Sequence, residues 1–358
     1  MPNYNEQLRE LLKIAIQEKA SDIHFSVAHP PTLRVERKLI PLMKFKILTS
    51  EDTRELAFVL LTEEQRERFL KIKEIDFSYR FENIARFRVN AFFQKEEISV
   101  AMRLIPTEVK TIEELNLPPI LHEFTKATQG FVLVTGPSSH GKSTTLAALI
   151  DEINHQKAVH IITIEDPIEY FFEDDRAIVD QREIGLDTLS FAKALRSTFR
   201  QDPDVIMVGE MRDPETIATA ITAAETGHLV FSTLHTNDAS QTIHRIVDTF
   251  PPAQQGQIRA QLSGSLLGVI AQRLVPRIKG GLIPACEIMI STSAVANLIR
   301  ENKIHEIPMV IETSAEMGMI TLNKALANLV RAKEITMRTA LEYSLNPVEL
   351  RKLVGRLG

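Results

Sequence analysis

The stretch from Phe131 to Thr145, FVLVTGPSSHGKSTT, constrains the fold more than any other part of the chain. Phe131 to Thr135 is a short apolar run that favours β structure, which predicts a buried strand. Gly136 to Ser143 then fits the pattern G-x-x-x-x-G-K-[ST] of a phosphate-binding loop. The next residues, TTLAALIDEI, have helical periodicity. A strand, a glycine loop and a helix in this order predict a P loop that binds ATP and Mg²⁺.

The spacing of this motif has a physical reason. Gly136 and Gly141 let the backbone curl so that successive N–H groups point at phosphate oxygens, and the helix beginning near Lys142 adds the positive end of its dipole. Lys142 reaches the β- and γ-phosphates, and the Ser143 hydroxyl binds Mg²⁺. The predicted ATP-binding residues are Gly136, Pro137, Ser138, Ser139, His140, Gly141, Lys142, Ser143 and Thr144.

His140 is unusual inside such a loop. Two positions are open to its side chain, one covering the phosphates and one in solvent. The sequence favours the solvent-exposed position.

Composition narrows the class of protein. The 358 residues suffice for two domains. The formal net charge of -5 gives no sign of a large basic surface, so no direct contact with nucleic acid is expected. One cysteine, Cys286, excludes an internal disulfide or a four-cysteine zinc site and fits a reducing compartment. No apolar run approaches the length of a membrane span. We therefore expect a cytoplasmic protein that meets a membrane only through a partner.

The chain divides by pattern into three parts. Residues 1–107 hold an amphipathic helix, two short helices with acidic starts and alternating strands, which predicts an α+β domain. Residues 108–119 form the expected linker. Residues 120–358 begin with apolar strands at 131–135, 160–165, 204–210 and 228–234, separated by helices, which predicts a parallel sheet. From Pro251 onward the chain is predicted to be mostly helical, including residues 257–274.

Two acids end strands of this sheet. Glu210 ends DVIMVGE, and in P-loop enzymes the strand beside the loop carries acids toward Mg²⁺. Because Gly209 stands where many such enzymes have aspartate, the Mg²⁺ role falls to Glu210. Glu165 ends the strand HIITIE, at the edge where open α/β sheets bind ligands, and is the candidate to orient or deprotonate the attacking water. The spacing leaves open which of the two is the base.

Histidines and arginines supply further candidates. His228 and His235 bracket the HLVFSTL strand, and His235 is expected near the phosphates, where it would sense or stabilise charge. An arginine donated by a neighbouring subunit stabilises the charge on a transferring phosphoryl group. The candidates are Arg80, Arg86 and Arg88 in the N-terminal sheet, and Arg196, Arg200 and Arg212 in the second domain.

Taken together, the motifs resemble those of the PilT family of type IV pilus retraction ATPases, within the secretion ATPase superfamily. ASDIHFSVAHPPTLRV is similar to the N-terminal signature of that family, GPSSHGKSTT to its Walker A, and TIEDPIEY to its Asp box. DPDVIMVGEMRDPETI is similar to its Walker B, and TAAETGHLVFSTLHT to the stretch with its His box. The family usually has threonine, glycine and serine at 138, 139 and 140.

This resemblance implies an α/β fold with a RecA-like P-loop core, a smaller PAS-like N-terminal domain and a helical C-terminal region. It implies a cytoplasmic homo-hexamer at the inner face of the inner membrane that hydrolyses ATP, retracts pili for twitching motility and meets the platform protein of the pilus. Lys142 and Ser143 would hold phosphate and Mg²⁺. Glu210 matches the Walker B acid, Glu165 the proposed base, and His235 the His-box residue. Arg80, Arg86 and Arg88 would reach a neighbour's site.

One departure keeps alternatives open. The family's retraction motif reads close to AIRNLIRE, whereas residues 294–301 here are AVANLIRE, with Val295 and Ala296 at the changed positions. A diverged paralogue, a non-catalytic accessory subunit, and a secretion or DNA-transfer ATPase remain alternatives to the principal retraction motor. A small-molecule kinase is a further alternative, for which the sequence offers no acceptor signature.

Overall fold

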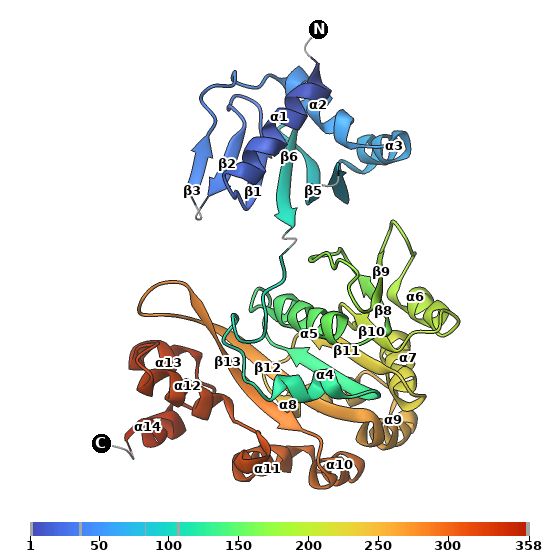
Figure 1. The fold of residues 1–358 in the computed structure, drawn as a ribbon, viewed down its shortest axis with the longest axis vertical. Coiled ribbons are helices and arrows are strands. Elements are labelled where there is room, and N and C mark those ends of the chain that lie inside the picture. The colour runs from blue at the N-terminus through green and yellow to red at the C-terminus, as the bar shows by residue number, and fades with distance from the viewer. Residues whose placement is uncertain (1–2, 36–37, 83, 106–107, 356–358) are drawn as a thin grey trace. The chain divides into compact units, whose positions relative to one another are not determined.

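The structure, a computed structural model, describes residues 3–35, 38–82, 84–105 and 108–355 (Figure 1). It divides the chain into two units. One comprises residues 1–108 together with 167–171, and the other comprises 109–166 together with 172–358. The predicted domain boundary at 107 lies outside the described residues.

The first unit is built on a six-stranded antiparallel sheet with the strand order β3-β2-β1-β6-β5-β4. Strands β4 and β5 alternate buried residues with more exposed ones over most of their length, as the sequence predicted, and leucines of α1 and phenylalanines of β4 and β5 share one apolar core. The elements are α1 (Tyr4–Gln17), β1 (Asp22–Phe25), β2 (Thr32–Val35), β3 (Lys38–Pro41), α2 (Ser50–Leu60), α3 (Glu63–Ile72), β4 (Glu74–Phe81), β5 (Ala85–Gln94) and β6 (Glu97–Ile105).

The second unit contains a seven-stranded sheet with the order β13-β12-β7-β11-β10-β8-β9. Every neighbouring pair from β12 to β9 is parallel, and β13 pairs antiparallel with β12. The strands are β7 (Gly130–Thr135), β8 (His160–Glu165), β9 (Ile178–Glu183), β10 (Val205–Val208), β11 (Leu229–Leu234), β12 (Leu266–Pro276) and β13 (Leu282–Ile290).

Helices cover both faces of this sheet, and each face has its own apolar core. The helices α4 (Leu121–Lys126) and α5 (Lys142–Gln156) cover one face. The other face is covered by α6 (Phe191–Thr198), α7 (Pro214–Glu225), α8 (Ala239–Asp248) and α9 (Pro252–Ser265). The α/β fold class predicted from the sequence is confirmed.

The prediction of a helix over residues 257–274 is wrong beyond Ser265. Helix α9 ends there, and the following run LLGVIAQRLVP forms β12. This strand pairs with β7, so that β12 and β11 flank β7 in the same sheet. Leucine and alanine spacing mimics a helical face, but most of the run is buried between the parallel strand β7 and the antiparallel strand β13, and in a strand covered on both faces apolar residues follow one another without a gap.

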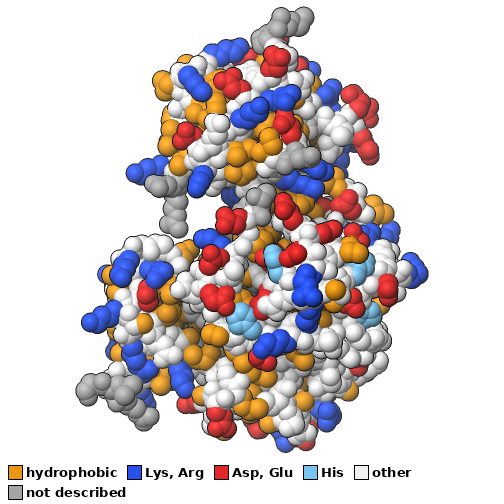
Figure 2. All heavy atoms as spheres, viewed as in Figure 1, with side chains coloured by type: hydrophobic (Ala, Val, Ile, Leu, Met, Phe, Trp, Pro, Cys, Tyr) orange, Lys and Arg blue, Asp and Glu red, His pale blue; other side chains and the backbone are white. Residues whose placement is uncertain are grey.

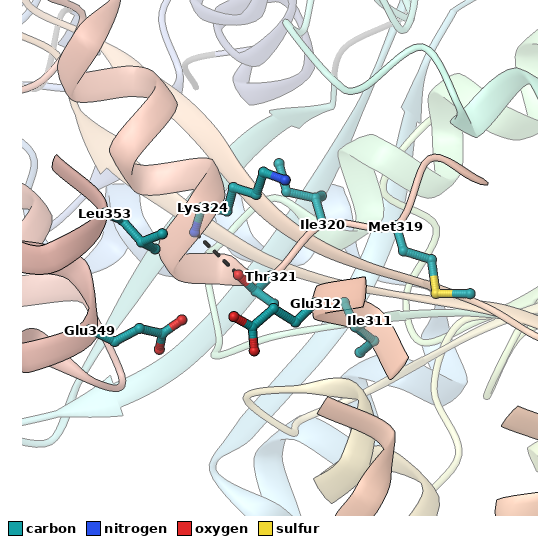
Figure 3. Close-up of a pocket in the computed structure, with 8 residues that line it drawn as sticks. All are labelled: Ile311, Glu312, Met319, Ile320, Thr321, Lys324, Glu349 and Leu353. Atoms are coloured by element: carbon teal, nitrogen blue, oxygen red, sulfur yellow. Dashed lines mark hydrogen bonds between the residues drawn. The ribbon is translucent and has the colours of Figure 1, made fainter. Parts of the chain in front are cut away.

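The C-terminal region is helical, as predicted, with α10 (Ser293–Arg300), α11 (Ile307–Thr313), α12 (Leu322–Arg331), α13 (Met337–Tyr343) and α14 (Pro347–Gly355). A pocket of about 170 Å³ opens among α11, α12 and α14. Ile311, Met319 and Leu353 contribute apolar lining, and the Glu312 and Glu349 carboxylates also line it (Figure 3). The pocket includes none of the predicted nucleotide-site residues.

Acidic and basic side chains are intermixed over the face of each unit seen in Figure 2. Among the described residues, none of the helices combines the length and apolarity needed to cross a bilayer.

Candidate nucleotide site

The P loop connects β7 to α5, and its glycines are required by the backbone. Gly136 has φ +144°, and a Cβ there would lie 2.3 Å from the carbonyl oxygen of Gln272 on β12. Gly141 has φ +80°, and a Cβ there would lie 2.9 Å from Nε2 of the same residue. Both conformations favour glycine. The loop is therefore shaped by its close approach to β12 as well as by its curl.

The N-terminus of α5 suits an anion. Within the described part of the chain no side chain caps this 15-residue helix, whereas Ser190, Asp213 and Asp238 cap the N-termini of α6, α7 and α8. The first N–H groups of a helix need acceptors from outside its own hydrogen-bond ladder. Phosphate oxygens fit this position in both charge and geometry.

Lys142 is oriented by the loop that it follows. Its side chain is buried, and Nζ donates to the carbonyl oxygens of Gly136 and Pro137 at 2.9 Å each. The same Nζ lies 3.5 Å from Nδ1 of His235. The ammonium group is thus held at the mouth of the loop, where a phosphate would bind.

The strand order brings the predicted residues into a row at the carboxyl edge of the sheet. The P loop follows β7, His235 follows β11, Glu210 follows β10, and Glu165 ends β8. The expectation that the Glu210 strand lies beside the P-loop strand is wrong, because β11 lies between them. This intervening strand is what places His235 between Lys142 and Glu210.

His235 links the two charged neighbours. Its Nε2 lies 3.8 Å from Oε2 of Glu210, and Oε1 of Glu210 accepts from Nη2 of the exposed Arg212 at 2.6 Å. Burial and the positive charge of Lys142 hold the pKa of His235 below its usual value, against the opposing effect of Glu210. The imidazole is therefore neutral near pH 7, in a form that donates from one nitrogen and accepts at the other.

Glu165 is buried and held by two donors. Its Oε1 accepts from Oγ1 of Thr163 at 2.6 Å and from Nε2 of Gln181 on β9 at 3.1 Å. The backbone N–H of Phe172 donates to Oε1 of Gln181, which fixes the amide so that its NH₂ group faces Glu165. Sequence reasoning missed Thr163 and Gln181. The polar Gln181 lies in the run IVDQRE, which was not recognised as a strand.

The P loop is also anchored to β12. The amide of Gln272 is buried, accepts from Oγ1 of Thr145 at 2.7 Å and donates to the carbonyl oxygen of His140 at 2.8 Å. The backbone N–H of Leu274 donates to Nδ1 of His140 at 2.9 Å. The expected solvent exposure of His140 is therefore corrected, since its side chain is half-buried and bonded to β12.

The oxygen atoms of Ser143 and Glu210 are suitable ligands for Mg²⁺. Ser143 is in the first turn of α5, and Glu210 follows the end of β10 beside His235. A hydroxyl and a carboxylate are hard oxygen ligands of the kind Mg²⁺ prefers. Ser138 and Ser139 are exposed, and Thr144 is half-buried in the first turn of α5.

Several predicted residues lie elsewhere. His228 precedes β11, at the opposite edge of the sheet, and its Nδ1 is 2.9 Å from the carbonyl oxygen of Ala223. Arg196 forms an ion pair with Glu215, and Arg200 is exposed just beyond α6. Neither His228 nor these two arginines joins the row.

The N-terminal arginines belong to the first unit. Arg80 and Arg86 are directly opposite on β4 and β5, and Arg88 is opposite Arg103 on β6. All lie on the sheet face away from the apolar core, because their neighbours Phe81, Phe87 and Val89 are buried. Arg86 also lies over the ring of Phe171, with its guanidinium carbon 3.5 Å from the ring centroid.

The strand order, the P loop and the row of Lys142, His235, Glu210 and Glu165 define a P-loop nucleotide-binding protein. A family model described as Type II/IV secretion system protein matches residues 4–345, and the chain belongs to this family.

The chain is similar over nearly its whole length to proteins of type IV pilus systems. The type IV pilus retractation ATPase PilT of Pseudomonas aeruginosa is 45% identical over 340 residues, covering 95% of this chain and 98% of that protein. The type IV pilus ATPase PilU of the same organism is 40% identical over 349 residues, covering 97% and 91%. A crystal structure of the pilus retraction motor PilT with bound ADP gives a TM-score of 0.90 at 47% identity, covering 96% of this chain and 98% of that one.

Proposed function

We propose that this chain is an ATPase that powers the retraction of type IV pili and, through retraction, twitching motility. Full-length similarity to a retraction ATPase supports this function, as does the overall match to the retraction motor with bound ADP. The chain's own P loop, with its uncapped helix and its buried Lys142, supplies the nucleotide site.

The observation that carries the proposal is the placement of His235 between Lys142 and Glu210. Lys142 neutralises phosphate charge, and Ser143 with Glu210 would hold Mg²⁺, which polarises phosphate oxygens when bound. The neutral imidazole of His235 would then contact the γ-phosphate. Glu165, held by Thr163 and Gln181, is aligned to orient or deprotonate the attacking water.

The direct test is phosphate release by the purified full chain, with no acceptor added. We expect Lys142→Ala to abolish it, while the exposed Lys193→Ala on α6 leaves it unchanged. Unaltered activity in Lys142→Ala would overturn the site assignment. Release that appears only when a small-molecule acceptor is supplied would favour a kinase instead.

We further propose that the chain acts as a homo-hexameric ring in the cytoplasm, at the inner face of the inner membrane, bound to the platform protein of the pilus. Arg80, Arg86 and Arg88 would then reach the site of an adjacent subunit, where their guanidinium groups would stabilise the charge on the transferring phosphoryl group. Specific activity should rise steeply with protein concentration as the hexamer mass appears, and Arg88→Ala should lower activity without lowering that mass. A fully active monomer would contradict the ring.

A paralogous or accessory retraction ATPase is the second candidate. It is favoured by helix α10, where half-buried Ala296 stands in place of the family's usual arginine, and by the similarity to PilU. Expression in a strain that lacks its retraction motor separates the two functions. Restored twitching identifies a principal motor, and restoration only beside an inactive copy of that motor identifies an accessory one. A secretion or DNA-transfer ATPase would not restore twitching in either strain.

A further inference from the structure

We propose that His140 is a protonation-sensitive latch that holds the P loop against β12, so that the chain binds nucleotide more weakly once the imidazole takes up a proton. This inference rests on the nucleotide-binding role proposed for the P loop. It assigns His140 a positioning role, since its bonded nitrogen faces β12.

The latch has a side-chain part and a backbone part. Nδ1 of His140 accepts from the Leu274 N–H at 2.9 Å, and the carbonyl oxygen of His140 accepts from Nε2 of Gln272 at 2.8 Å. Gln272 continues the connection, because its Oε1 accepts from Thr145 on α5. His140 of the loop and Thr145 of α5 are thus hydrogen-bonded to two nearby residues of β12, Gln272 and Leu274.

The chemistry of the ring makes the contact conditional. A backbone N–H is always a donor, so Nδ1 must present a lone pair, and the ring must be the neutral tautomer with its proton on Nε2. A protonated imidazole carries N–H groups at both nitrogens. Nδ1–H would then face the N–H of Leu274, and the hydrogen bond would be replaced by repulsion.

The surroundings favour the neutral ring. Charged and titratable groups face it from each packed element: Arg273 from β12, Lys142 from α5, and Tyr343 from α13, whose ring centroid is 6.4 Å away. Burial, followed by the positive charges of Arg273 and Lys142, lowers the pKa of His140 below 6.5. A base with a lowered pKa stays neutral above that value, so the latch is closed at neutral pH and opens as the pH falls through it.

The adjacent backbone explains why the loop needs holding. Ser139 has φ +64°, in the left-handed region of backbone conformation. Residues other than glycine adopt this conformation only at a cost in free energy. The loop must keep this conformation for its N–H groups to converge on a phosphate. With the latch open, Ser139 is free to relax, and the binding shape is no longer formed in advance.

The test is the dissociation constant of ADP for the full-length chain, measured by calorimetry between about pH 5.5 and 8. Because one net hydrogen bond changes an equilibrium about threefold to tenfold, wild type should weaken by about that factor on acidification. His140→Leu, which lacks the acceptor, should bind weakly at every pH. In His140→Asn, Oδ1 stands near the place of Nδ1 and does not titrate, so most of the affinity should return with a flat pH profile.

Controls isolate the latch. His235 is present in each variant, so its titration cancels when the variants are compared. Exposed His305→Asn should keep the wild-type profile. The proposal is overturned if His140→Asn keeps the full acid weakening, or if His140→Leu binds like wild type near pH 8. Absence of ADP binding by wild type at every pH would instead overturn the nucleotide site itself.

Discussion

The two sides of the P-loop strand hold the nucleotide site with opposite chemistry. Toward β11, β10 and β8, the site is a charged row in which Lys142, His235, Glu210 and Glu165 follow one another along the sheet edge. Toward β12, the loop is held by the Gln272 amide, the neutral His140 ring and the Leu274 N–H. The charged groups of the row lie on the side where phosphoryl transfer needs them, whereas the contacts from β12 that hold the loop are made by an amide, a backbone N–H and a neutral ring.

This difference separates two kinds of substitution. Changes on the charged side should alter the rate of hydrolysis more than the stability of the fold. Changes on the β12 side should alter stability and nucleotide affinity first, because they act on the conformation of the loop.

The largest effect is expected at the acids of the charged row. Glu165→Gln should lower kcat about 10²–10⁴-fold if it acts as general base, while ADP affinity is retained. Glu210→Gln should instead make hydrolysis require more Mg²⁺. Steady-state kinetics over a Mg²⁺ series separates the two roles. Glu225→Gln, at the C-terminal end of α7 and bonded to Gln261, is the matched control and should behave as wild type. A full-rate Glu165→Gln would remove Glu165 from the chemistry.

Gly136→Ala tests the close approach to β12. Both the φ of +144° and the 2.3 Å contact with the Gln272 carbonyl oxygen oppose a side chain here, and we expect a loss of about 3 kcal/mol or more in the free energy of unfolding. Gly227→Ala is the control, because its φ is +115° but, beyond its two chain neighbours, no atom of the residues that the structure describes lies within 4 Å of the added Cβ. It should cost about 1–2 kcal/mol. Equal losses in urea denaturation would mean that β12 does not constrain the loop.

How much the sequence predicts also differs between the two sides. Lys142, Glu165, Glu210 and His235 all sit in contiguous motifs, and parallel strands place their carboxyl ends at one edge, so a linear pattern suffices. The β12 side has no such pattern. Gln272 and Leu274 are about 130 positions from the loop, at separations of 132 and 134 residues from His140. Their role exists only because strand pairing puts β12 beside β7, and the leucine spacing of that run favoured a helix.

The N-terminal unit was the more predictable part of the fold. Its antiparallel strands alternate buried and exposed side chains, which the sequence displays directly. β9 was missed for the converse reason, since IVDQRE is a largely polar edge strand. Because β9 was not predicted, Gln181 was not recognised as a site residue, although its side chain orients Glu165.

Glu287 on β13 offers a pH test of the β12 side of the P-loop strand, because β13 pairs with β12. Its Oε1 accepts from the N–H of Ala239 at the start of α8, and burial raises its pKa from 4.5 to about 7. The folded state therefore retains the proton longer than the unfolded state. The contribution of Glu287 to the free energy of unfolding should fall as the pH rises from about 4.5 to 7 and change no further above that range.

Glu287→Gln keeps an oxygen for Ala239 and has no charge to bury. It should unfold like wild type near pH 5 and be about 1–2 kcal/mol more stable near pH 8. Thermal melts across this range measure the effect, with exposed Glu316→Gln as the control. A variant that is less stable than wild type at pH 8 would show that the carboxylate is stabilising, and that this side of the site does carry charge.

Ser139→Gly is expected to have the smallest effect and to connect the two kinds of constraint. Relief of the left-handed conformation gains about 1–2 kcal/mol, and the greater freedom of glycine in the unfolded chain takes back about 0.5–1. A net gain of about 0–1.5 kcal/mol should follow, whereas neighbouring Ser138→Gly, without a positive φ, should only lose stability. Because glycine removes the strain that the His140 contact opposes, His140→Leu should weaken ADP binding less in the Ser139→Gly background than in wild type. Strictly additive effects on ADP affinity would mean that the strain and the latch act independently, and that the β12 side holds the loop through Gln272 alone.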